Sequence, residues 1–338
     1  MRSRLLIGGA LMLLCAGPAR AAEDCNRACL QGILEQYLTA LIKHDPSAAP
    51  LFAGFRQTEN AVVRRPGTGL WQTVTKLGRV QRRYFDPVTG QAAFFGIINE
   101  GEKEAIVTVR LRIEQRKITE AEWYLGRRGD DSMNGPAQPS GQGGNLFNPD
   151  NLAANAPPET TLARDARASR DAMIAATNSY FDGITSHDGT IIQAVPGCPR
   201  FENGQTMAGR GNTPPPAAPG TPPPVGPQGR GGAAGPPLAA DCTGGLERIN
   251  IQFVAARRYP LVDEEAGVVL AHAVFIRPPG VPQRRNAFAE WFFFDHGRIK
   301  SIYSAMFYPP DNVPLPNWPP YEGNFPIPPT AAPAAPAR

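Results

Sequence analysis

The chain of 338 residues contains one residue pattern twice, and a single constant offset in the numbering relates the two copies. Five residues of the first copy recur in the second with the same spacing: Tyr37, His44, Asp45, Glu59 and Asn60 return as Tyr180, His187, Asp188, Glu202 and Asn203. A second shared block, Arg82-Arg83-Tyr84 and Arg257-Arg258-Tyr259, is related by a larger offset because the second copy carries extra residues. A repeat of this kind indicates one domain present twice. The residues by which the copies differ are therefore the ones to search for chemistry.

Residues 1–21 have the pattern of a signal peptide. Arg2 and Arg4 precede an apolar stretch from Leu5 to Ala16, and Ala19-Arg20-Ala21 offers a small-x-small cleavage site. Its removal takes away three arginines, so the formal charge falls from +4 to +1 (4 − 3). A nearly neutral chain gives no electrostatic argument for binding nucleic acid or an anionic membrane. No other apolar run approaches the roughly 20 residues that span a bilayer, so we expect a periplasmic or secreted protein.

Four cysteines follow the signal peptide, which is an even number in an oxidising compartment. Two disulfides are the default expectation there, although four cysteines allow three pairings. Cys198 and Cys242 bracket a segment rich in Pro and Gly, so we favour a bond between them, which leaves Cys25 to pair with Cys29. We expect these bonds to be structural, and no spacing in the chain predicts a metal ion or an organic cofactor.

Each copy begins with helical periodicity and continues with strand patterns, which is an α+β order. The expected helices are 30–43, a second helix after Asp45, 70–77 and 166–185, and the expected strands are 79–86, 91–99, 104–115, 117–126, 253–262, 268–277, 287–295 and 298–308. The predicted organisation is a first domain at 22–128, a linker at 129–163, a second domain at 164–310 with an insertion at 210–240, and a proline-rich tail at 311–338. We predict that each domain is a cone-shaped, curved antiparallel sheet wrapped on two to three helices.

Two kinds of repeated residue lie on or beside the first helix of each copy. Asp45 and Asp188 are placed to cap the segment that follows them, and capping is the interpretation we favour. Tyr37 and Tyr180 lie on the apolar stripe of their helices and carry a hydroxyl that needs a partner when buried. Each tyrosine is either a packed core residue with an incidental partner or a hydrogen-bond donor in a dry pocket.

Polar residues further along each copy also have two interpretations. Glu59-Asn60 and Glu202-Asn203 are candidates for binding a ligand, and a half-buried Glu can act as a base with a raised pKa or fix the fold through backbone amides. Arg257 and Arg258 alternate sides of a strand, so one of them should face inward, to neutralise the Glu or to bind a ligand carboxylate.

The strongest difference between the copies is Glu290, which lies in the apolar segment Phe288–Phe294. The equivalent position of the first copy is near Val109. A carboxyl inside an apolar strand costs stability unless it is paired or protonated, and such groups are site candidates. His272, on the neighbouring expected strand, is either a partner of Glu290 or a solvent-facing histidine, and it is a further candidate for ligand binding.

The segment 36–45, with Tyr37 eight residues before Asp45, resembles the first helix of ketosteroid isomerase. The segment 294–299 resembles that enzyme's last hairpin, with Glu290 four residues before Phe294. The chain therefore resembles the nuclear-transport-factor-2-like superfamily, which includes this isomerase and the SnoaL-like cyclases. The resemblance implies that Tyr180 and Glu290 form an oxyanion hole, with Glu290 held protonated as the corresponding carboxylic acid of ketosteroid isomerase is. Asn203 stands near the position of that enzyme's general base and cannot accept a proton. The neighbouring Glu202 can replace it only if the strand shifts register, since adjacent residues of a strand point to opposite faces.

Cys198-Pro-Arg-Phe-Glu-Asn-Gly204, Cys242 and Arg257-Arg-Tyr-x-x-x-Asp263 together also resemble a secreted family of unknown function from fungi and bacteria. From both resemblances we expect two domains that pack as an intramolecular pseudo-dimer in a monomeric chain. The expected partner is a small, largely apolar cyclic or aromatic molecule bound by the second domain. If the protein is an enzyme, the resemblance implies an isomerase or lyase without a cofactor; the alternative is a non-catalytic binding or scaffold protein.

Overall fold

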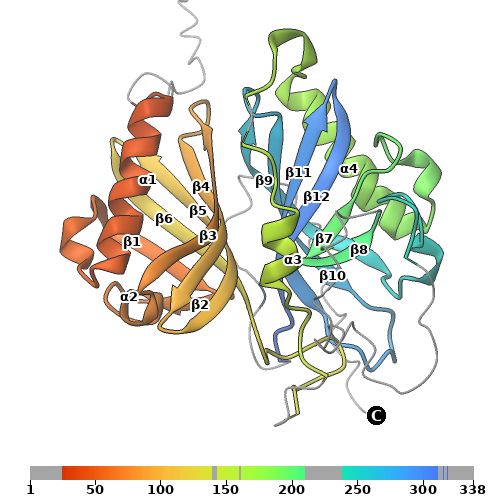
Figure 1. Ribbon diagram of the computed structural model, residues 1–338, viewed down its shortest axis with the longest axis horizontal. Helices are drawn as coiled ribbons and strands as arrows, with labels where there is room; N and C mark the ends of the chain where they lie inside the picture. The colour runs from red at the N-terminus through yellow and green to blue at the C-terminus, as the bar shows by residue number, and fades with distance from the viewer. Residues whose placement is uncertain are drawn as a thin grey trace, which may run out of the picture.

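The computed structural model describes residues 25–138, 143–159, 161–209 and 238–310, together with Leu315 and Trp318. The expected signal peptide, most of the insertion and most of the tail lie outside these residues. Within them the chain has two domains, each a six-stranded sheet with one long helix on its outer face (Figure 1). The layers therefore run helix, sheet, sheet, helix, an α+β arrangement. No helix in the described ranges is long and apolar enough to cross a membrane.

The first sheet has the strand order β2-β1-β6-β5-β4-β3 and carries helix α1 (Arg27–Ile42). Its strands are β1 (Leu51–Glu59), β2 (Val62–Arg64), β3 (Lys76–Asp86), β4 (Gln91–Glu100), β5 (Lys103–Glu114) and β6 (Lys117–Arg127), with the short helix α2 (Leu70–Thr73) between β2 and β3. The second sheet repeats this order as β8-β7-β12-β11-β10-β9 and carries helix α4 (Arg170–Ser186). Its strands are β7 (Arg200–Glu202), β8 (Gln205–Ala208), β9 (Phe253–Asp263), β10 (Val268–Ile276), β11 (Asn286–Asp295) and β12 (Arg298–Phe307).

The sheets are mixed and not antiparallel as expected, because β1 runs parallel to β6 and β7 runs parallel to β12. The helix expected after Asp45 is only a 3-10 turn, Pro46–Ala48, followed at once by β1. Asp45 caps this turn as expected, its carboxylate accepting from the Ser47 amide. Pro50 explains why the turn ends there, since the residue before a proline avoids the helical region and Ala49 is extended.

The expected linker also holds structure, the helix α3 (Pro149–Ala154). Asn148 caps this helix by accepting from the Asn151 amide, with Pro149 at the first helical position. Helix α3 contacts β3 and β5 of the first domain and β8 of the second. The segment therefore bridges the two domains.

Three apolar clusters hold the layers together. One lies between α1 and the first sheet, and another lies between α4 and the second sheet. The third joins the inner faces of both sheets, with residues such as Ile106 and Tyr124 from one and Leu270 and Trp291 from the other. Trp318 of the tail is buried, and its indole N–H donates to Thr58 Oγ1 at 3.1 Å.

Two equivalent contacts join the domains reciprocally. Arg27 of the first copy binds Asp263 at 2.8 Å, and Asp263 accepts from the Phe85 amide at 3.0 Å. The counterpart Arg170 is related to Arg27 by the offset that relates Tyr180 to Tyr37. Arg170 binds Asp86, which accepts from the Val262 amide at 3.0 Å. Each domain thus gives its partner the same arginine and the same aspartate.

Two disulfides join Cys25 to Cys29 and Cys198 to Cys242, the pairing that we favoured from the sequence. The first lies at the start of α1, beside Arg27. The second closes the base of the loop that contains the insertion. Two such bonds are typical of proteins that mature in an oxidising compartment.

Candidate functional site in the second domain

A buried group of polar side chains lies between α4 and the second sheet. Tyr180 projects from α4, is 1% exposed, and accepts a hydrogen bond from Arg200 Nη1 at 3.0 Å. Arg200 is the first residue of β7, and its Nε lies 3.6 Å from Glu202 Oε1. Burial raises the pKa of Tyr180 above its ordinary value, against the opposing charge of Arg200. The phenol is therefore neutral and keeps its own proton.

Glu290 faces the same side of the sheet. In the strand register Glu290 of β11 lies opposite Ser304 of β12, which in turn lies opposite Glu202 of β7. Glu290 and Glu202 are thus two strands apart, about 10 Å between backbones, and long side chains bridge part of that distance. Glu290 is 3% exposed, and its Oε2 has no hydrogen-bond partner among the described residues.

The protonation of Glu290 follows from this setting. Burial raises the pKa of Glu290 to about 8, with Glu202 adding to the rise and Arg200 opposing it. Near neutral pH the carboxyl is mostly protonated and can donate a hydrogen bond. No hydrogen bond joins Glu290 to Tyr180 directly.

The first domain has a closed network around its tyrosine and an apolar residue where the second has Glu290. Tyr37 donates to Gln57 Oε1 and accepts from the Trp123 indole, both at 3.0 Å. Trp71 donates a second bond to Gln57 Oε1 at 2.9 Å. This network connects Tyr37, Gln57, Trp71 and Trp123, and the position of Glu290 is taken by the apolar Val109. The tyrosine of the first domain is a packed core residue.

Equivalent contacts match the residues of the two domains. Asn60 N donates to Trp123 O and Asn203 N donates to Ser304 O, each at 3.0 Å, so Ser304 stands in the place of Trp123. Since Val109 pairs with Trp123 and Glu290 pairs with Ser304, the expected match of Val109 and Glu290 is correct.

The contacts of the two repeated histidines show a further correspondence between the domains. His44 Nδ1 lies 2.7 Å from Trp71 O, and His187 Nδ1 lies 2.9 Å from Leu246 O, so Leu246 replaces Trp71. The offset between the tyrosines also relates position 57, which is Gln, to position 200, which is Arg. The second domain therefore exchanges two tryptophans for smaller residues and gains a cation and a carboxyl.

Four other candidates have structural roles. Asn60 and Asn203 both have positive φ angles, and each amide side chain bonds both the N–H and the C=O of a neighbouring strand residue, Leu125 or Met306. Glu59 accepts from the Leu70 amide at 2.9 Å, at the start of α2. Arg257 faces α4, where it pairs with Asp182 at 2.6 Å and lies over the ring of Phe181. None of these four lies free to bind a ligand.

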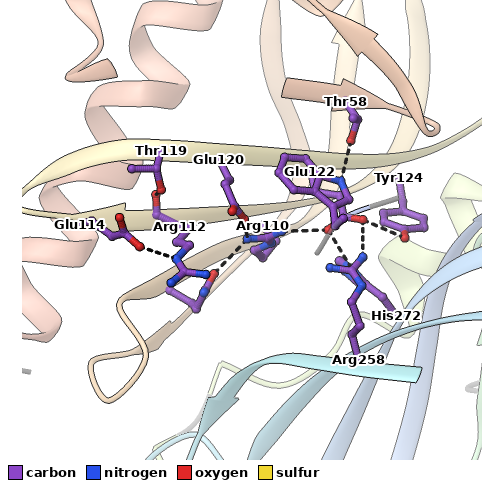
Figure 2. Close-up of polar contacts among 12 residues, drawn as sticks. Thr58, Arg110, Arg112, Glu114, Thr119, Glu120, Glu122, Tyr124, Arg258 and His272 are labelled. Carbon is purple, nitrogen blue, oxygen red and sulfur yellow. Dashed lines mark hydrogen bonds and ion pairs between the residues drawn. The ribbon is translucent and has the colours of Figure 1, made fainter. Parts of the chain in front are cut away.

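Arg258 and His272 lie on the opposite face of the second sheet, so the predicted pairing of His272 with Glu290 is wrong. In the register His272 faces Ala289, and successive residues of a strand point to opposite faces, which places Glu290 on the other side. Both residues instead reach Glu122 of the first domain: Arg258 Nη2 at 2.5 Å and His272 Nδ1 at 3.1 Å (Figure 2).

Glu122 is the centre of a buried polar cluster between the sheets (Figure 2). Arg110 of its own domain lies 3.0 Å away, and Tyr124 donates to it at 3.1 Å. Burial alone would raise the pKa of Glu122, but Arg258 and His272 hold it well below its usual range. Burial lowers the pKa of His272 to about 4, so its imidazole is neutral at neutral pH. This cluster joins the domains and does not face the interior that contains Tyr180.

Sequence reasoning missed Arg200 as a site residue. The offset of the repeat makes Arg200 the equivalent of Gln57, and this change from a neutral amide to a cation can be seen in the sequence. The described residues hold no group of three or more His, Cys, Asp or Glu side chains that could bind a metal ion.

Residues 166–306 match the model of a family described as "Domain of unknown function (DUF8021)". The matched residues lie in the second copy, which contains the site. No curated protein matches the chain at a significant level.

Proposed function

We propose that the second domain binds a small, largely apolar cyclic or aromatic molecule between α4 and its sheet. Tyr180 and Glu290 would bond an oxygen of that molecule. The observation that carries this proposal is the Oε2 atom of Glu290, which is buried without a hydrogen-bond partner among the described residues, at a position where the first copy has Val109.

The energetic argument supports a ligand. A buried polar group that lacks its hydrogen bond costs about 1–3 kcal/mol, and native structures keep few such groups without a functional reason. The first copy solves the same packing problem with Val109 and a connected network around Tyr37. The second copy retains the costly carboxyl, as expected if a ligand supplies the partner.

Catalysis is a second candidate, favoured by the two carboxyls of the site. The raised pKa of Glu290, about 8, suits a hydrogen-bond donor, while Glu202 can serve as a base. In a cofactor-free isomerase or lyase, Glu202 would take a proton from a carbon beside a carbonyl, and Tyr180 and Glu290 would stabilise the resulting enolate. The ion pair between Arg200 and Glu202 favours the non-catalytic alternative, since it engages the base.

We also propose that the domains have the cone-shaped fold of the nuclear-transport-factor-2-like superfamily and form an intramolecular pseudo-dimer. The reciprocal contacts of Arg27 with Asp263 and of Arg170 with Asp86 support this arrangement. The two disulfides support export to the periplasm or the medium.

A thermal-shift screen against steroids, lactones and lignin-type aromatics tests the proposal. A ligand raises the melting temperature of the parent by mass action, and this shift should be lost in Tyr180→Phe and Glu290→Gln. Tyr37→Phe is the matched control, since it changes the equivalent tyrosine of the domain that has a closed network, and it should keep the shift. If no compound stabilises the parent, or if Tyr37→Phe abolishes the shift as fully as Tyr180→Phe, the proposal fails.

A further inference from the structure

We propose that the inner face of the first sheet contains a binding site for a tryptophan side chain, formed by Arg56, Thr58 and Arg110. The C-terminal tail uses this site to fasten the two domains together, because the site holds the chain's own Trp318. It belongs to the first domain and is separate from the site proposed in the second.

The site binds both the ring and the N–H group of the indole. Trp318 is 3% exposed although it belongs to the tail, and its N–H donates to Thr58 Oγ1, which is itself buried. The guanidinium carbons of Arg56 and Arg110 lie 4.1 and 5.0 Å from the centre of the ring. At these distances a cation is attracted to an aromatic face. A phenylalanine in this place would keep the contact with the arginines but leave the Thr58 hydroxyl without its donor.

The tryptophan site adjoins the ionic cluster around Glu122. In the strand registers Glu122 lies opposite Thr58 on one side and opposite Arg110 on the other (Figure 2). Arg110 serves both, since its Nη2 lies 3.0 Å from Glu122 while its guanidinium faces the Trp318 ring. Glu122 in turn binds Arg258 of the second domain. The indole of the tail thus lies next to the charges that join the domains, and its removal should admit water to them.

The second sheet fills the equivalent place with its own side chains. The offset of the repeat relates Thr58 to Phe201, and the registers relate Glu122 to Tyr303. Phe201 and Tyr303 stack with ring centroids 4.8 Å apart, and the Tyr303 hydroxyl donates to the carbonyl of Asn155 in the linker at 2.9 Å. The linker, which follows the first domain, contacts the second sheet here. In the same way the tail, which follows the second domain, contacts the first sheet.

The sequence around Trp318 suits a segment that binds. The first sheet has polar residues where the second has two aromatic rings, so the tail supplies the missing ring. Prolines stand at positions 314, 316, 319 and 320. Proline fixes φ, so a segment with many prolines loses fewer conformations when it binds. Leu315 packs against the apolar cluster that both sheets share. Since the tail continues from β12, the binding of Trp318 ties the second domain to the first.

A dye-labelled synthetic peptide of residues 311–323 tests the site in the full-length protein. Trp318→Ala empties the site, and fluorescence anisotropy should detect binding of the peptide to this variant. The parent should bind the peptide at least about tenfold more weakly, equivalent to 1.4 kcal/mol, because its own tail competes. A peptide that carries the Trp318→Ala change should bind neither protein.

Two further changes, each combined with Trp318→Ala, test which residues hold the indole. Arg56→Gln and Thr58→Val should both weaken the binding of the peptide. Arg65→Gln is the matched control, since it removes an exposed arginine just after β2, and it should leave the affinity unchanged. If the peptide does not bind the folded Trp318→Ala variant, or if Arg65→Gln weakens binding as much as Arg56→Gln does, the proposal is overturned.

A double-mutant cycle tests the same contact with smaller changes, in case Trp318→Ala does not fold. Trp318→Phe keeps a ring and removes the N–H, and Thr58→Val removes the acceptor. Each change should lower the urea midpoint of unfolding, and the double variant should unfold close to the weaker single variant, because both changes remove one hydrogen bond. Additive losses would show that Thr58 does not recognise the indole and would overturn the proposal.

Discussion

At the scale of single residues, two buried glutamates show how neighbours decide the state of a carboxyl. Glu122 and Glu290 are both at most 3% exposed. Two arginines and a histidine surround Glu122 and lower its pKa, whereas burial without a partner raises the pKa of Glu290 to about 8. The first carboxylate is therefore structural and charged, and the second is neutral, with no partner among the described residues for its Oε2.

Replacing each glutamate by glutamine should have opposite effects on stability. Because the pKa of Glu290 is raised in the folded state, the protein loses stability as the pH rises from the ordinary glutamate pKa of 4.5 to about 8. Glu290→Gln should therefore stabilise the protein at pH 8, by on the order of a few kcal/mol, but not at pH 4.5. The pKa of Glu122 is lowered in the folded state, so its carboxylate contributes to stability at pH values above the ordinary glutamate pKa. Glu122→Gln should therefore cost roughly 3–5 kcal/mol at neutral pH. Urea unfolding at several pH values measures both, and parallel pH profiles would contradict the argument.

At the scale of elements, the sequence predicted the strands that have a clear local pattern of apolar residues and turns. Eight of the twelve strands in the described residues were expected, with ends within three residues of those observed, because apolar runs and turns mark them. Strands β1, β2, β7 and β8 were missed: β1 begins with exposed residues, and the other three have only three or four residues each. Strands β1 and β7 pair in parallel with a strand far along the chain, and no local turn announces such a pairing.

This omission had a consequence for the site. Arg200 and Glu202 are the two ends of β7, and the register of β7 on β12 sets Glu202 opposite Ser304, while Arg200 donates to Tyr180. Tyr180, Glu202 and Glu290 could be identified from the repeat and from an acid in an apolar strand. The sequence could not predict which side of the sheet Arg258 and His272 face, because bulges in β9 and β10 shift the register between Leu270 and Val274.

The two disulfides should contribute unequally to stability because they close loops of different length. Cys198 and Cys242 are 44 residues apart, and Cys25 and Cys29 are 4 apart. In the chain-entropy model these spacings correspond to about 4 and about 2 kcal/mol. We expect the double variant Cys198→Ala/Cys242→Ala to lose more stability than Cys25→Ala/Cys29→Ala in urea unfolding. A larger loss for the shorter loop would mean that its bond acts mainly by holding Arg27 against the second domain.

At the scale of the whole molecule, the contact between the sheets is reciprocal in position but not in chemistry. Arg110 and Glu122 of the first domain meet His272 of the second in the ionic cluster (Figure 2). The strand registers place Trp291 and Tyr303 at the equivalent positions of the second domain, and both contact Phe95 of the first, with ring centroids 6.0 and 6.2 Å apart. If two copies of the first domain paired with each other, Arg110 and Glu122 of each copy would face Phe95 of the other.

This difference explains why the unlike domains should pair in preference to like ones. A buried charge without its partner costs several kcal/mol, so the ionic cluster disfavours self-pairing of the first domain. The reciprocal ion pairs at Asp86 and Asp263, in contrast, are equally available to any pairing. The arrangement thus combines a general contact, inherited from the duplication, with a selective one.

If the reciprocal contacts act alike, Asp86→Asn and Asp263→Asn should lower the free energy of unfolding by similar amounts. Each aspartate is buried, pairs with a partly exposed arginine and accepts a backbone amide of the other domain. The exposed arginines reduce the expected cost to on the order of 2 kcal/mol. Glu114→Gln breaks an exposed pair with Arg112 and should cost less than about 1 kcal/mol. Urea unfolding followed by fluorescence should give one transition for the parent, since both sheets share an apolar cluster. A large loss in only one of the two aspartate variants would show that the domains contact each other symmetrically in geometry but not in energy.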